Sequence, residues 1–84
     1  MSDPLSRLQT LSHVTGIKQS KRAIAAGNAE TALIAADADS HVTEPIVTLC
    51  TDNNVPIERV DTMEELGHAA GIDVGCAVVV LLRH

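Results

Sequence analysis

An almost unbroken apolar run near the end of the chain, Cys76 to Leu82, constrains the fold more than any other feature. A strand whose alternating faces are both apolar must be covered on both sides, as the strands inside a layered α/β protein are. The run therefore predicts a central strand in a sheet that carries helices on both of its faces.

Shorter elements alternate along the rest of the chain. We expect helices over residues 4–11, 17–26, 43–53 and 63–70, and strands over 13–15, 31–36, 57–60 and 76–82. The clearest local signal is the capping box from Thr62 to Glu65. Gly27 and Gly71 are expected to end their helices, and Pro45 is expected in the first turn of the third. The predicted fold class is α/β (α+β), a three-layer α/β/α sandwich with a small four-stranded mixed sheet.

The connections between these elements are all short, and neither a linker nor an internal repeat is present. Residues 1–84 are therefore predicted to form a single domain.

Composition excludes several classes of protein. The chain has no Phe, Tyr or Trp, which disfavours modules that stack single-stranded bases on aromatic rings. It contains no apolar run near the roughly 18 residues of a membrane span, and no secretory pattern at its start. We expect a cytoplasmic protein without a membrane partner.

Metal-binding and catalytic chemistry are not indicated. Four histidines and two cysteines show no metal-site spacing, namely His13, His41, His68, His84, Cys50 and Cys76. The two cysteines are expected to be reduced core residues, although their spacing leaves a disulfide open. No nucleophile is arranged with a base, so we expect no enzyme activity, no cofactor and no metal.

Positive charge is concentrated near the start of the helix expected over residues 17–26. The chain has a net charge of −5, yet only Asp3 of its 11 acidic residues precedes Asn28. Four of its six cations do so, namely Arg7, Lys18, Lys21 and Arg22. A helix N-terminus already offers free N–H groups and a positive dipole end, so this segment predicts a site for phosphate or a nucleic-acid groove.

Helical spacing places Lys18, Gln19 and Arg22 on one exposed face, while Ile17 and Ile24 face the sheet. Lysine and arginine donate to guanine O6 and N7, and glutamine both donates and accepts. The alternative is that these cations are the solvated face of a surface helix. The overall acidity argues against broad coating of DNA, so we expect a small shaped patch and no DNA partner.

The order of motifs resembles one family. The motifs are Gly16 to Ile24, Ala35 to Asp39, Leu49-Cys50 near Asn54 to Pro56, and Leu66 to Ile72. In this order they resemble the L7Ae/L30e family of ribosomal, kink-turn RNA-binding proteins, and most closely its small stand-alone bacterial members.

The resemblance implies the α/β/α sandwich and a structured RNA partner with a kink-turn, a sharply bent internal loop with sheared G·A pairs. Ribosomal RNA is one candidate, with a ribosome-associated or riboregulatory role and a monomeric protein. Eight residues are implied to bind RNA: Gly16, Lys18, Gln19, Lys21 and Arg22 at the helix start, and Ile72, Asp73 and Val74 in a loop that faces an extruded nucleotide.

Two details of this pattern depart from other family members. Archaeal relatives usually carry Asn-Glu where this chain has Lys18-Gln19, and Asp73 stands where the family loop often has a basic residue. Two alternatives stay open: residues 72–74 could simply lead into the last strand, and the scaffold could be a protein-interaction module without specific RNA binding. A third, a small-molecule enzyme with sites between subunits, would need a pocket lined by Arg59 or Arg83.

Overall fold

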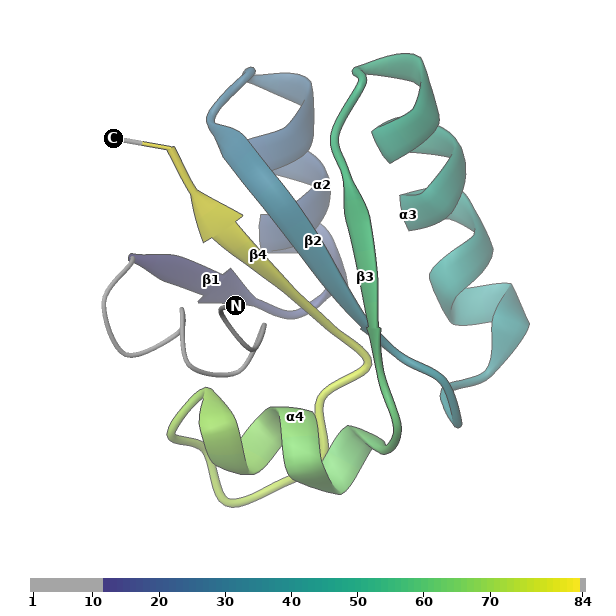
Figure 1. Cartoon of the computed structure of the whole chain (residues 1–84), viewed down its shortest axis with the longest axis vertical. Helices are drawn as coiled ribbons and strands as arrows, with labels where there is room; N and C mark the ends of the chain where they lie inside the picture. The colour runs from purple at the N-terminus through teal and green to yellow at the C-terminus, as the bar shows by residue number, and fades with distance from the viewer. Residues whose placement is uncertain (1–11, 84) are drawn as a thin grey trace.

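Strand β4 (Val78–Leu82) lies inside a four-stranded sheet with the order β1-β4-β2-β3 (Figure 1). The structure, a computed structural model, describes residues 12–83, so the helix expected over 4–11 lies outside the described residues. Strands β1 (His13–Thr15) and β2 (Ala29–Ala35) flank β4, each antiparallel to it. Strand β3 (Ile57–Val60) pairs with β2 in parallel, which makes the sheet mixed, as predicted.

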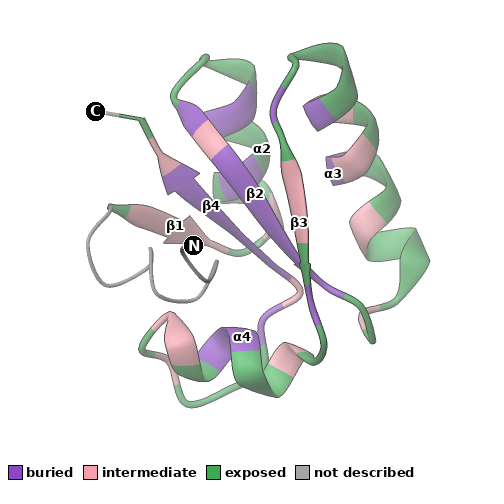
Figure 2. Cartoon of the chain, in the orientation of Figure 1, coloured by how far each residue is buried: buried purple, intermediate pink, exposed green. Residues whose placement is uncertain are grey.

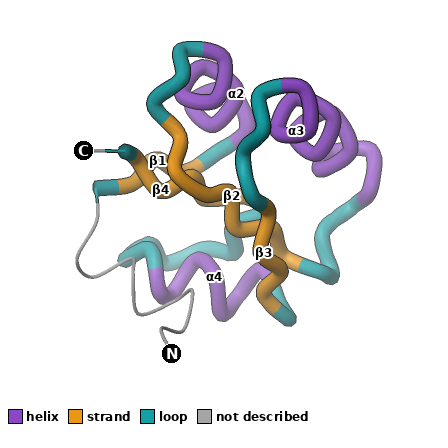
Figure 3. Tube along the Cα trace, turned by 45° about the horizontal axis from the view of Figure 1, so that its top comes forward, coloured by secondary structure: helices purple, strands orange, loops and turns teal. Residues whose placement is uncertain are grey.

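Three helices in this part of the chain cover the two faces of the sheet. Helices α2 (Ile17–Ala25) and α3 (Ser40–Asp52) pack side by side on one face, and α4 (Met63–Ala69) lies on the other (Figures 1 and 3). The predicted α/β class and layered architecture are confirmed.

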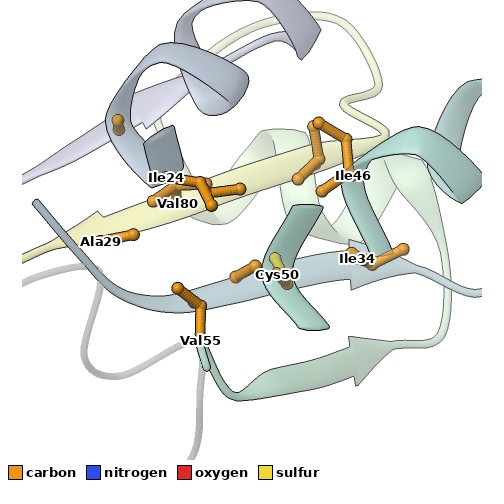
Figure 4. Packing of buried hydrophobic residues seen from close by; sticks show 10 residues of the cluster. Ile24, Ala29, Ile34, Ile46, Cys50, Val55 and Val80 are labelled. Atoms are coloured by element: carbon orange, nitrogen blue, oxygen red, sulfur yellow. The ribbon is translucent and has the colours of Figure 1, made fainter. Parts of the chain in front are cut away.

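Alternation along β4 divides the core into two layers. Val78 and Val80 point toward α2 and α3, where they pack with Ile24 and Ile46 (Figure 4). Val79 and Leu81 point the other way and pack with Leu66 of α4. All four strand residues are 0% exposed, so the central strand is buried on both faces, as the apolar run predicts (Figure 2).

Three element boundaries differ from the prediction by two residues or more. Helix α3 begins at Ser40 rather than Thr43, because the Asp39 carboxylate accepts a hydrogen bond from the His41 N–H at 2.8 Å and caps the helix there. Pro45 consequently lies inside the helix and not in its first turn. Strand β2 begins two residues early, at Ala29.

The last strand begins two residues late because Cys76 has other partners. Its backbone N–H donates to the Met63 carbonyl at 3.0 Å, which holds Cys76 against the start of α4. Its thiol donates to the Val78 carbonyl at 2.9 Å.

The two cysteines lie on opposite faces of the sheet. Cys50 belongs to the layer of α2 and α3, whereas Cys76 belongs to the layer of α4. Both are free and buried, so the disulfide left open by the sequence does not form. Among residues 12–83, no helix has the length and apolar character that crossing a bilayer requires.

Candidate nucleic-acid interface

Gly16 links β1 to α2 in a conformation that other residues rarely adopt. Its φ is +87°, in the region where a side chain is strained. Its N–H points to the Val78 carbonyl at 3.4 Å, and its own carbonyl accepts from the Ser20 N–H at 3.1 Å. Gly16 therefore turns the chain sharply from the sheet into the helix, and among the described residues no atom beyond its chain neighbours lies within 4 Å of where its Cβ would be.

The start of α2 is uncapped, unlike the other two helices of the described part. Asp39 caps α3 and Thr62 caps α4 through their side chains, but Gly16 has none, and no acidic residue lies in the first turn of α2. The first N–H groups of this helix keep free hydrogen-bonding capacity, and the positive end of its dipole is not offset.

The side chains of α2 divide as its spacing predicts. Lys18, Gln19 and Arg22 are exposed, whereas Ser20 and Ile24 are 0% exposed. Among residues 12–83, the Ser20 hydroxyl is a buried group without a hydrogen-bond partner. The cationic face of the helix is therefore open to a partner.

Residues 72–75 form a loop that comes after α4, and backbone hydrogen bonds hold the turn between the helix and the loop. Gly71, with a φ of +82°, donates its N–H to the His68 carbonyl at 3.1 Å, and the Ile72 N–H donates to the Gly67 carbonyl at 3.0 Å. Gly71 thus ends α4, as predicted. Beyond it Ile72 is half-buried, Asp73 is exposed, and Val74 is 69% exposed.

An apolar groove of about 260 Å³ lies between the start of α2 and this loop. Gly16 and Ile17 line one side, and Ile72 and Val74 line the other. No charged residue lines it. The two segments selected from the sequence, 56 residues apart at Gly16 and Ile72, are therefore neighbours in the fold.

Two of the eight selected residues, Lys21 and Asp73, line other hollows and not this groove. Lys21 lies on the side of α2 that faces α3, in a hollow of about 610 Å³ with His41, Glu44 and Asp52. Asp73 lines a third hollow, of about 450 Å³, between the loop and α4. Beside Ile72, Val74 and Gly75, that hollow is lined by Thr62, Glu64, Glu65 and His68. The loop thus has an uncharged side toward α2 and an acidic side toward α4.

Sequence reasoning missed several lining residues of the groove. Gly75 and Ala77 line it, and Ile17 contributes to it besides anchoring the helix. Gly75 is also a position of close contact, because a Cβ atom there would lie 3.1 Å from the Cβ of Met63.

The described part of the chain holds no group of three or more side chains that could bind a metal ion. Burial raises the pKa of the Cys50 thiol, because the low-dielectric core disfavours the thiolate. A nucleophilic role for this cysteine therefore has no support.

Comparisons with known proteins identify the family that this chain resembles and several relatives. A family model described as "Ribosomal protein L7Ae/L30e/S12e/Gadd45 family" matches residues 6–83. An "RNA-binding protein" of Geobacillus thermodenitrificans (strain NG80-2) is 42% identical over 76 residues, covering 90% of this chain and 93% of the relative. The "RNA-binding protein YbxF" of Geobacillus stearothermophilus is 41% identical over 76 residues with the same coverage. These relatives are named as RNA-binding proteins and not as enzymes.

Solved structures share the fold. The "Giardia lamblia 15.5kD RNA binding protein" matches with a TM-score of 0.81 at 23% sequence identity, covering 100% of this chain and 78% of that chain. A Bacillus halodurans protein described as of unknown function matches with a TM-score of 0.79 at 22% identity, covering 94% of this chain and 77% of that one.

Proposed function

This chain belongs to the ribosomal protein L7Ae/L30e/S12e/Gadd45 family, and from that premise we propose that it is an RNA-binding protein that recognises a kink-turn. The observation that carries the proposal is the apolar groove between the start of α2 and the loop 72–75. Its partner is a structured RNA, ribosomal or riboregulatory, and binding involves no catalytic step.

The start of α2 supplies the polar contacts. Lys18 and Arg22 donate to guanine O6 and N7 at the sheared pairs, while Gln19 donates and accepts at a neighbouring base edge. The uncapped N–H groups of the first turn add donors for a phosphate oxygen. Gly16 has no side chain, so the RNA backbone approaches the helix closely.

The loop supplies the apolar contacts. A sharp bend in RNA leaves a base unstacked, and an unstacked base needs a surface to cover it. Val74 is 69% exposed and Ile72 half-buried, and both line the groove. Covering an aliphatic side chain of this size contributes up to about 1.5–3 kcal/mol.

Charge sets the direction from which RNA approaches. Glu64, Glu65 and Asp73 line the hollow on the other side of the loop, and carboxylates repel phosphates. The phosphate backbone therefore lies across α2, and the loop meets RNA with its uncharged side.

We also propose that the protein binds RNA as a monomer and that it does so in the cytoplasm. A single copy suffices, because one chain forms the whole groove. Two free buried thiols suit a reducing compartment, which supports a cytoplasmic location.

The test is a titration with a kink-turn RNA and with the same RNA whose G·A pairs are replaced by Watson–Crick pairs. Lys18→Ala or Arg22→Ala should weaken binding to the first RNA by about 1–3 kcal/mol. Arg59→Ala, which removes an exposed cation from the edge strand β3, serves as the matched control and should bind like the wild type.

Equal affinity of the wild type for the two RNAs would refute kink-turn recognition. Absence of binding to either RNA would favour the protein-interaction module as the function of this scaffold.

A further inference from the structure

Gly67 lies at the closest approach between α4 and the loop 72–75. It is a buried residue in the middle of the helix. A methyl group at this position would overlap the Val74 carbonyl oxygen, and it would lie 3.1 Å from the Val74 carbonyl carbon and 3.2 Å from the Gly75 Cα. All three neighbours are backbone atoms, so no change of rotamer could relieve the overlap.

The loop is tied to α4 on both sides of this contact. The Ile72 N–H donates to the Gly67 carbonyl at 3.0 Å, and the Cys76 N–H donates to the Met63 carbonyl at 3.0 Å. Between these two bonds the Val74 peptide rests directly on the glycine. Adding a methyl group at Gly67 would push this peptide away from the helix while both ends of the loop stay attached.

The side chain carried by that peptide lines the groove opposite Gly16 and Ile17. Moving the Val74 peptide therefore changes the shape of the groove. The exposed side chains of Lys18, Gln19 and Arg22 belong to α2, so the same movement leaves them in place.

From these contacts we infer that Gly67 is a positioning residue, which sets the width of the groove and thereby the affinity for RNA that presents an unstacked base. This inference rests on the proposed function and deepens it. Gly67 does not touch the RNA itself; it lets the loop lie close enough to α4 for Val74 to meet the base.

The experiment is a double-mutant cycle between protein and RNA. Wild type, Gly67→Ala and Lys18→Ala are each titrated with a kink-turn RNA and with the same RNA made abasic at its unstacked nucleotide. We expect removal of the base to weaken the wild type about ten-fold, which is about 1.4 kcal/mol. It should weaken Gly67→Ala far less, because the contact between loop and base is already lost in that variant. Lys18→Ala should keep the full ten-fold loss, because its groove is unchanged.

Destabilisation is controlled with a second glycine. Gly27 has a φ of +78° at the end of α2, and a Cβ atom there would meet nothing within 4 Å. Gly27→Ala should therefore lower the melting temperature by backbone strain and leave both RNA affinities unchanged. In the free protein, NMR spectra of Gly67→Ala should show shifted Val74 methyl signals and unshifted amides at residues 18–22.

If Gly67→Ala does not fold, Gly75→Ala replaces it, since a methyl group there would lie 3.1 Å from the Met63 Cβ and displace the same loop by a smaller amount. The inference is overturned if the folded variant retains the full abasic loss, or if its Val74 signals do not move. Equal affinity of the wild type for kink-turn RNA and its Watson–Crick counterpart would instead overturn the proposed function, and the NMR result would still test the role of Gly67.

Discussion

Ser20 is a residue whose chemistry does not match its surroundings. It is 0% exposed on the sheet-facing side of α2, and its hydroxyl has no hydrogen-bond partner within residues 12–83. Burying a hydroxyl without a partner costs about 1–3 kcal/mol, and alanine is also the better helix former.

We predict that Ser20→Ala raises the free energy of unfolding by about 1 kcal/mol, because it removes the unpaired hydroxyl and leaves only a small void. Urea denaturation followed by circular dichroism measures the change. Thr48→Ala, at an exposed position of α3, is the control for helix propensity alone and should gain only about 0.5 kcal/mol. A loss of stability in Ser20→Ala would mean that the hydroxyl is satisfied in solution.

The buried thiol of Cys50 leads to a prediction about pH. Burial raises its pKa in the folded protein above that of the unfolded chain, so the folded state holds this proton more tightly. The associated stability is fully present below the unfolded pKa of about 8.5 and is lost as the pH rises through the folded pKa. Between pH 7 and pH 10 the wild type should therefore lose more unfolding free energy than Cys50→Ala. Parallel curves for the two proteins in urea titrations would contradict this.

At the scale of elements, the short helix α4 depends on the residue that caps its start, Thr62. With seven residues, α4 is too short to persist alone, so its cap and its packing hold it in place. The Thr62 hydroxyl accepts a hydrogen bond from the Glu65 N–H at 3.0 Å, which satisfies one of the open donors of the first turn. The loop 72–75 is bonded to this helix, so the cap also supports the proposed RNA site.

We predict that Thr62→Ala lowers the free energy of unfolding by about 1 kcal/mol, because the Glu65 N–H loses its partner. Thr62→Ser keeps the hydroxyl and should restore most of the loss. Equilibrium unfolding in urea measures both variants. Equal losses in Ala and Ser would show that the methyl group of Thr62, and not the hydrogen bond, stabilises the helix start.

Local sequence signals predicted most element boundaries. Gly16 and Gly27 mark the two ends of α2 within one residue, and the Thr62 capping box marks α4 equally well. The errors arose where a residue had two possible roles. Asp39 precedes the helix expected from Thr43, but its side chain caps α3 three residues early. Cys76 fits a strand by its apolar character, but it is bonded to Met63 instead.

At the scale of the whole molecule, local sequence patterns could not predict that the start of α2 and the loop 72–75 lie next to each other. The exposed face of Lys18, Gln19 and Arg22 follows from helical period alone. The proximity of Gly16 to Ile72 and Val74 depends on the strand order β1-β4-β2-β3, which no local signal specifies. Only the family resemblance paired the two segments. The close contact of Gly67 with Val74 likewise depends on tertiary packing.

The negative charges of the protein repel RNA phosphates over a distance that depends on the salt concentration. The described part of the molecule measures 29 × 28 × 23 Å. The Debye length is about 8 Å at 0.15 M salt and about 30 Å at 0.01 M, so charges across the molecule reach the site only at low salt. Glu30 follows Ala29, which pairs with Leu82 at one end of β4. The other end of β4, at Val78, contacts Gly16 at the start of α2, so Glu30 lies at the end of the sheet far from the site.

We predict that Glu30→Gln binds kink-turn RNA about two-fold more tightly at 10 mM salt and like the wild type at 150 mM, because screening removes the distant repulsion. Asp73→Asn, beside Val74 in the loop, is the matched control and should tighten binding at both salt concentrations, because its charge lies close to the bound RNA. Fluorescence anisotropy titrations over this range measure both, and the wild-type slope should correspond to about two to three neutralised phosphates. An equal gain from Glu30→Gln at both concentrations would mean that RNA contacts the far end of the sheet, which would move the interface away from α2 and the loop.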